Sequence, residues 1–223
     1  MTSIEAITLE APDPAAANAF YTAAFDLDIR VRARLSQAPT TGFRGFAMSL
    51  VVSQPSTADS LISTALGAGA TTLKPVTKGF WGYGGVVADP FGTIWKIASS
   101  AKKDAGPATR QIDEIVLLLG VADVAATKRF YLERGLPVAK SFGRKYVEFA
   151  TSPIKLALYS RRFAAKDAGV SPDGTGSHRL VIESDAGTFT DPDGFEWEAV
   201  GFRRAAGVCT GTGAAAGRPM SIP

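Results

Sequence analysis

The residue types that carry out most enzymatic chemistry are scarce in this chain of 223 residues. It contains one histidine, His178, and one cysteine, Cys209. A single cysteine excludes an intrachain disulfide and a zinc site built from several cysteines. His178 has no serine or cysteine at a recognised motif spacing, and the sequence contains no nucleophile-elbow, Walker or dinucleotide-binding motif. We therefore do not expect a nucleophilic enzyme.

Aromatic side chains offer a different kind of chemistry, the rigid contact surface of a ligand pocket. Trp81 and Tyr83 lie in the segment FWGYGG, whose glycines are typical of an exposed and adjustable loop. Trp95, Tyr146, Tyr159 and Trp197 are further candidates to line a pocket, although most of these aromatic residues are more typical of a core. The side chains that we expect to contact a ligand are Trp81, Tyr83, Tyr146 and Tyr159.

Two segments of the chain repeat around an aspartate and an aromatic pair. Asp13 is followed seven residues later by Phe20-Tyr21, and the second copy has Asp123 followed by Phe130-Tyr131. An aspartate accepts hydrogen bonds from the free amides of a first helical turn, and the aromatic pair gives the helix an apolar stripe. This pattern predicts helices over 14–25 and 124–134.

A second repeat predicts a turn followed by a strand. The segments are DPFGTIWKIA at 89–98 and DPDGFEWEAV at 191–200. Proline fixes φ at the first central position of a turn, and glycine accepts a positive φ. The alternating apolar run that follows predicts a strand with a tryptophan on one face.

Together these anchors predict an α+β fold made of tandem pairs of βαβββ modules, which form two curled, mixed-sheet units. The first unit spans 1–101, a linker follows at 102–110, the second unit spans 111–201, and the tail covers 202–223. Further expected elements are strands at 5–10, 29–34, 46–53, 112–119, 145–149, 155–159 and 178–183, and a helix at 57–66.

The last module is expected to be truncated, because the strand at 178–183 runs almost directly into the second DPxG turn. An insertion, RRFAAKDAGVSPDGTGS at 161–177, precedes it. Its basic start and its Gly- and Pro-rich end predict a mobile loop. The tail after Phe202 has little pattern and is expected to be extended or disordered.

Charge and hydropathy narrow the range of partners. The net charge of +3 comes from dispersed basic residues, which predict a solvated surface rather than a nucleic-acid site. The opening MTSIEAITLE lacks a signal-peptide pattern, and no stretch of about 18 apolar residues occurs. We expect a cytoplasmic protein, monomeric or homodimeric, with a small-molecule ligand and with neither nucleic acid nor membrane as a partner.

The two repeated motifs together resemble the vicinal oxygen chelate superfamily, which includes glyoxalase I, extradiol dioxygenases and bleomycin-resistance proteins. The likeness covers about 4–100 and 111–200. It implies that paired modules curl into a cup that holds a ligand and, in the enzymes, a divalent metal acting as a Lewis acid. It also implies that the metal ligands come from opening strands and from the strand after DPxG.

The first unit has lost these ligand positions. The opening-strand positions fall on Ala6 and near Ala47, neither of which binds metal, and the final-strand position is Lys96, whose ammonium repels a cation. The resemblance therefore implies that the first unit is free of metal.

The second unit keeps more of the pattern. Glu198 stands at the final-strand position, and His178 opens the last module's strand, where a ligand histidine is often found. The third position falls on Val116, but Glu114 lies two residues earlier on the same strand face. A shift in register would give a set of His178, Glu198 and Glu114, suited to iron, manganese, magnesium or nickel. The alternative is that both glutamates are ordinary solvated or salt-bridged strand residues.

Three functions follow from these observations. The first is a binding protein without a metal, whose cup holds a small hydrophobic or aromatic molecule. The basic chain favours a neutral or anionic ligand. The second is a metal-dependent lyase or dioxygenase with its site in the second unit. The third is a partner-binding role for the insertion at 161–177 and the tail.

Overall fold

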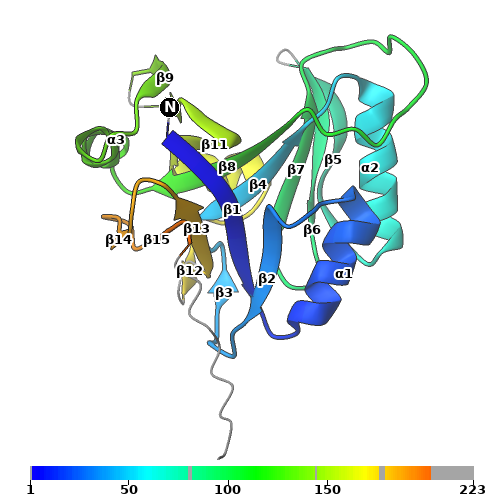
Figure 1. Ribbon diagram of the computed structural model, residues 1–223. Helices are drawn as coiled ribbons and strands as arrows, with labels where there is room; N and C mark the ends of the chain where they lie inside the picture. Colours follow the sequence, from blue (N-terminus) through cyan, green and yellow to red (C-terminus); the bar gives the residue numbers. More distant parts are fainter. Residues whose placement is uncertain (1, 80–81, 144, 176–178, 202–223) are drawn as a thin grey trace, which may run out of the picture.

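The computed structural model describes residues 2–79, 82–143, 145–175 and 179–201 (Figure 1). Trp81, His178, Cys209 and the tail from 202 onward lie outside the described residues. The described part of the chain forms four α-helices and fifteen strands. None of its helices is long and apolar enough to cross a membrane.

The first half of the chain forms a short module followed by a full one. The elements of this half are β1 (Thr2–Ala11), α1 (Pro14–Phe25), β2 (Val31–Leu35), β3 (Thr41–Gly42), β4 (Phe46–Val51), α2 (Pro55–Gly67), β5 (Thr71–Gly79), β6 (Gly82–Ala88) and β7 (Ile94–Ser99). The first module is β1, α1 and β2, and the second is β4, α2, β5, β6 and β7.

The second half forms a full module, an insertion and a short module. Its elements are β8 (Glu114–Val121), α3 (Val124–Glu133), β9 (Val138–Phe142), β10 (Tyr146–Phe149), β11 (Thr151–Ser160), α4 (Arg161–Ala168), β12 (Gly174–Thr175), β13 (Leu180–Ser184), β14 (Phe189–Thr190) and β15 (Glu196–Ala199). The third module is β8, α3, β9, β10 and β11, and the fourth is β13, β14 and β15. As predicted, β13 leads into the second DPxG turn with no helix between them.

The repeated aspartates begin two of the helices. The Asp13 carboxylate accepts a hydrogen bond from the amide of Ala16, and the Asp123 carboxylate accepts from the amides of Ala125 and Ala126. Each aspartate thus satisfies amides that a first helical turn leaves free. The predicted starts of α1 and α3 are confirmed, and the α+β fold with βαβββ modules is confirmed with them.

Strand pairing joins modules from opposite halves of the chain. Strands β4 and β8 pair antiparallel, with Ser49 opposite Val116, and so join the second module to the third. Strands β1 and β13 pair antiparallel, with Thr8 opposite Val181, and so join the first module to the fourth. Parallel pairing of Thr2–Ile4 with β11 makes these parts one sheet of thirteen strands.

Helix packing, in contrast, joins modules within each half. Trp95 on β7 lies against the rings of Tyr21 and Phe25 from α1, and Trp197 on β15 lies against Tyr131 from α3. Figure 1 shows α1 and α2 beside each other on one side of the sheet. The contacts between helices and tryptophans therefore stay within each half, while the central strands pair with the other half. The limits 1–101 and 111–201 stay a prediction as domain boundaries.

The insertion differs from its prediction, because 161–168 form helix α4 rather than a mobile loop. The Ser160 hydroxyl accepts a hydrogen bond from the amide of Phe163, and Gly169 ends the helix in the left-handed conformation. The buried side of α4 consists of Ala164, Ala165 and Ala168, and the basic start and Gly- and Pro-rich end of the insertion led the sequence interpretation to a loop. The helix is stabilised by the surface that it covers, which the sequence does not show.

Candidate binding cleft and its blocked counterpart

Each DPxG turn is held by its aspartate, which fixes the strand that follows. The Asp89 carboxylate accepts hydrogen bonds from the amides of Phe91 and Thr93 and from the Trp95 indole. The Asp191 carboxylate accepts from the amide of Phe195 and, at 2.5 Å, from the Tyr131 hydroxyl. Burial raises the pKa of both carboxyl groups, and these hydrogen bonds oppose that rise. The turns thereby set the register of β7 and β15.

The paired modules form two concave sheet faces, which we call the 1–4 cup and the 2–3 cup after the modules that build them. The 1–4 cup comprises the faces of β1, β2, β13 and β15 that carry Thr8, Arg32, Glu183 and Glu198. The 2–3 cup comprises the faces of β4, β7, β8 and β11 that carry Ala47, Lys96, Leu118 and Tyr159.

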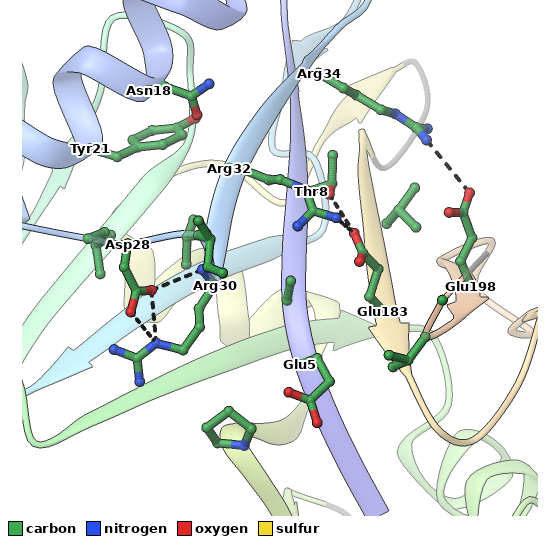
Figure 2. A pocket seen from close by; sticks show the side chains of 18 of the residues that line it. Glu5, Thr8, Asn18, Tyr21, Asp28, Arg30, Arg32, Arg34, Glu183 and Glu198 are labelled. Carbon is green, nitrogen blue, oxygen red and sulfur yellow. Dashed lines mark hydrogen bonds and ion pairs between the residues drawn. The ribbon is translucent and has the colours of Figure 1, made fainter. Parts of the chain in front are cut away.

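The 1–4 cup is open and forms a cleft of about 1580 Å³ (Figure 2). Charged side chains line it, namely Glu5, Asp28, Arg30, Arg32, Arg34, Glu183 and Glu198. Apolar side chains lie between and beside them, namely Ala6, Ile29, Pro153, Val181 and Val200. Ile29 is 79% exposed, so apolar surface at the rim is accessible. A cleft of this composition suits a ligand with an apolar body and a polar or charged group.

Two arginines of β2, Arg32 and Arg34, form ion pairs with nearby glutamates, and we call this group of side chains the charged centre. Arg32 donates to the Glu183 carboxylate, which also accepts a hydrogen bond from the Thr8 hydroxyl at 3.0 Å. Figure 2 shows these three side chains converging from β2, β13 and β1. The charge-assisted hydrogen bond between Arg32 and Glu183, together with the Thr8 hydroxyl, holds these partly buried side chains in place.

Arg34 forms a wider cluster at the far end of the same strand. Its Nη2 lies 2.6 Å from Glu10 Oε1 and 3.3 Å from Glu196 Oε2, and its Nη1 lies 3.9 Å from Glu198 Oε1. Burial lowers the pKa of Arg34, but the carboxylates of Glu10 and Glu196 outweigh this and raise it overall. Arg34 is therefore a fixed cation, whereas Glu198 is only loosely paired and 45% exposed.

A third ion pair, between Asp28 and Arg30, lies just before β2 at the opposite end of the cleft. Arg30 Nε lies 2.9 Å from Asp28 Oδ1, and this hydrogen bond is the main cause of the lowered pKa of Asp28. Figure 2 shows the pair standing apart from Arg32 and Arg34, below Asn18 and Tyr21 of α1. Both groups are about half exposed, so the pair adds little to stability.

The 2–3 cup is blocked by α4. Ala164, Ala168 and Asp167 of this helix lie against Ala47, Val86, Ile94, Lys96, Leu118 and Tyr159. Only about 10 Å³ remains between them, which is roughly one water-sized probe. Of the two cups that the fold provides, the 1–4 cup alone has room for a ligand among the described residues.

The predicted contact residues do not gather in the open cleft. The Tyr83 hydroxyl bonds to Asp59 of α2 at 2.8 Å, while Tyr146 and Tyr159 lie on the 2–3 side with ring centroids 5.1 Å apart. Tyr159 also packs on Phe163 of α4. Trp81 lies outside the described residues. The charged residues of β2 and β13 that line the cleft were missed, because only the strand pairing shows that they face one cavity.

The three predicted metal ligands are not assembled among the described residues. Glu114 lies on β8 and accepts a hydrogen bond from Lys155 at 2.5 Å, while Glu198 lies on β15 in the 1–4 cup. Three strands, β13, β1 and β11, stand between β15 and β8 in the sheet. The expectation placed both glutamates in one unit, but pairing across the halves puts them in different cups. His178 lies outside the described residues.

Solved structures share this arrangement of modules. Glyoxalase I from Zea mays superposes with a TM-score of 0.57 at 13% identity, covering 89% of this chain and 92% of that chain. The chain therefore has a glyoxalase-like fold. A putative dioxygenase from Bacillus subtilis superposes with a TM-score of 0.50 at 13% identity, covering 81% of this chain and 69% of that chain. No protein-family model and no curated protein matches the sequence.

The donor groups facing the two cups do not fit the divalent metal that the resemblance to this family implies. In the 1–4 cup Ala6, Glu183 and Glu198 lie side by side across three strands, next to the arginines of β2. A guanidinium has no lone pair to offer a cation. In the 2–3 cup the corresponding row holds Lys96 and Lys155. Within the described residues, no group of three or more His, Cys, Asp or Glu is placed to hold a metal ion.

Proposed function

We propose that this protein binds a small organic molecule in the cleft of the 1–4 cup, without a metal held by the residues described above. One observation carries the proposal, namely that the 1–4 cup is an open cleft of about 1580 Å³ while α4 blocks its counterpart. The ligand has a hydrophobic or aromatic body, which contacts Pro153, Ile29 and Val200, and a polar group, which meets the charged centre.

The charged centre contains both arginines and glutamates. A ligand with hydrogen-bond donors is therefore accommodated as well as the neutral or anionic ligand that the net charge of the chain favours. Arg32 is matched by Glu183, and Arg34 is shared among several carboxylates. Among the carboxylates that pair with Arg32 and Arg34, Glu198 is the most loosely held, because its nearest guanidinium nitrogen is 3.9 Å away. Hydrogen-bond donors of a ligand have a partner in Glu198, and acceptors have one in Arg34.

A thermal-shift screen of aromatic metabolites and antibiotics, followed by calorimetry on the hits, tests the proposal. Glu198→Trp places a large ring in the cleft at an exposed position and should weaken binding of a hit about tenfold or more, which is about 1.4 kcal/mol. Glu133→Trp on the exposed surface of α3 is the matched control and should leave the affinity unchanged. Unchanged affinity in Glu198→Trp would place the ligand elsewhere and contradict the proposal.

The alternative is a metal-dependent lyase or dioxygenase that uses His178, and elemental analysis distinguishes it. Protein reloaded with iron, manganese, nickel, zinc or magnesium should retain no stoichiometric metal after dialysis, because arginines stand among the facing donors. Stoichiometric metal in the wild-type protein that is lost in His178→Ala would favour the enzyme over the binding protein.

A further inference from the structure

Helix α4 sits on the 2–3 cup at the place where a ligand would lie in an open cup. Its buried residues, Ala164, Ala165 and Ala168, face the sheet. Strand β8 has Gly120 beneath the helix, and a Cβ at that position would lie 2.9 Å from the Cβ of Ala164. A side chain at Gly120 would therefore push the helix outward. Sheet and helix are fitted to each other by small residues on both sides.

One charged contact passes from the helix into the cup. Asp167 Oδ2 lies 2.5 Å from Lys96 Nζ, and both side chains are more than two-thirds buried. Lys96 projects from β7 at the final-strand position, in a row with Ser49 and Val116. Among the described ion pairs, Asp167 supplies the carboxylate that neutralises Lys96. The helix thus presents to the cup what an anionic ligand would present, a carboxylate beside an apolar surface.

The ends of α4 are tied to the protein by hydrogen bonds from long flexible side chains. Arg161 Nη2 donates to the carbonyl of Phe43 at 2.6 Å, and Lys74 Nζ donates to the carbonyl of Lys166 at 2.6 Å. Alanines bury little apolar area compared with the aromatic side chains that α1 and α3 bury. A short helix held mainly by such contacts should open locally, at lower free energy than the whole protein unfolds.

We propose that α4 is a tethered occupant of the 2–3 cup, and that the cup beneath it is a second site, which accepts an anionic molecule with an apolar body. Lys96 is the charged anchor of that site, and Ala47, Val86, Ile94, Leu118 and Tyr159 are its apolar walls. The anion is a carboxylate or sulfonate, which takes the place of the Asp167 side chain when the helix moves away. This site is independent of the ligand that occupies the 1–4 cup.

Expelling α4 tests the proposal directly. The double substitution Ala165→Asp with Ala168→Asp places two charges on the buried side of the helix, so that it no longer packs on the sheet. Calorimetry with 2-naphthoate should then show one site per chain, at least about tenfold tighter than in the wild-type protein. Adding Lys96→Met should remove about tenfold of that affinity, because the anion loses its charged partner.

A control separates this site from the 1–4 cup. Adding Glu198→Trp to the double variant should leave naphthoate affinity unchanged, because that residue lines the other cup. A folded double variant with no gain in affinity would overturn the proposal, as would a gain that Lys96→Met does not reduce. If adding Glu198→Trp to the double variant abolished naphthoate binding, the ligand would occupy the 1–4 cup. The second site would then be rejected, while the proposed function would stand.

Hydrogen exchange gives a second test, which needs no expelled helix. In the wild-type protein the amides of Ala164–Ala168 should exchange faster than those of β8, which lies beneath them. Asp167→Asn should accelerate exchange in α4 about fivefold and leave β8 unchanged, because one partly buried ion pair is lost. Exchange of α4 and β8 at the same rate in both proteins would show that the helix opens only on global unfolding and would overturn the proposal.

Discussion

Tyr21 and Tyr131 occupy repeated positions in α1 and α3 but have different partners. The Tyr131 hydroxyl donates to Asp191. The Tyr21 hydroxyl lies near Asp89 and Thr93, yet it is buried without a hydrogen bond of ordinary geometry to any described residue. In the first half the Trp95 indole donates to Asp89 instead. The repeat therefore keeps the aspartate and the ring while the donor to the aspartate changes.

This difference predicts unequal outcomes for the same substitution. Tyr131→Phe should lower the free energy of unfolding by about 1–3 kcal/mol, because the buried Asp191 carboxylate loses its side-chain donor. Tyr21→Phe removes a hydroxyl without a partner and should cost less than about 0.5 kcal/mol or even stabilise the fold. Urea unfolding of both variants measures the contrast, and equal losses would show that the Tyr21 hydroxyl is satisfied in solution.

Helix α4 shows how an element that buries only alanines depends on the surface beneath it. Its apolar side is built from alanines, and its partner on β8 is Gly120. Neither residue type suggests a helix–sheet contact when the sequence is considered alone. The contact arises because both surfaces are flat enough for close approach.

Gly120→Ala tests this contact at the level of the element. The new Cβ would lie 2.9 Å from the Cβ of Ala164, so α4 must shift outward, at a cost of about 1–3 kcal/mol in the free energy of unfolding. Gly67→Ala at the end of α2 is the matched control, since a Cβ there meets nothing within 4 Å. That control should be neutral or stabilising by up to about 1 kcal/mol. A neutral Gly120→Ala in chemical unfolding would contradict the close packing of α4.

On the scale of the whole molecule, the two halves of the chain exchange strand partners. Strands β1 and β4 of the first half pair with β13 and β8 of the second. Each half keeps its own helix packing around Trp95 or Trp197. A half taken alone would expose unpaired strand edges at the centre of the sheet.

Separate fragments test this arrangement. When residues 1–101 and 102–223 are expressed separately, each fragment should self-associate or fail to give a cooperative unfolding transition. The first fragment leaves β1 and β4 without their partners, and the second leaves β13 and β8 without theirs. Mixed in equal amounts, they should form a one-to-one complex with native circular dichroism. Sedimentation of each fragment and of the mixture provides the measurement, and two stable monomeric fragments would instead support two autonomous domains.

Repeated local chemistry in the sequence was enough to determine the modules. Asp13 and Asp123 predicted helix starts, and the two DPxG segments predicted turns that lead into strands, because capping and turn geometry depend on a few neighbouring residues. The same aspartates and DPxG segments also carried the resemblance from which the fold was predicted. Loss of the usual donors at Ala6 and Lys96 was also visible in the sequence.

Which modules share a cup was decided only by the tertiary structure. Glu183 and Arg32 are 151 residues apart in the chain, and they meet because β1 pairs with both β2 and β13. Glu114 and Glu198 were expected to meet and are separated by the same pairing. Pairing between strands is set by long-range burial and hydrogen bonding, which no local pattern encodes. For the same reason, the blocking of one cup by α4 became visible only once the sheet was assembled.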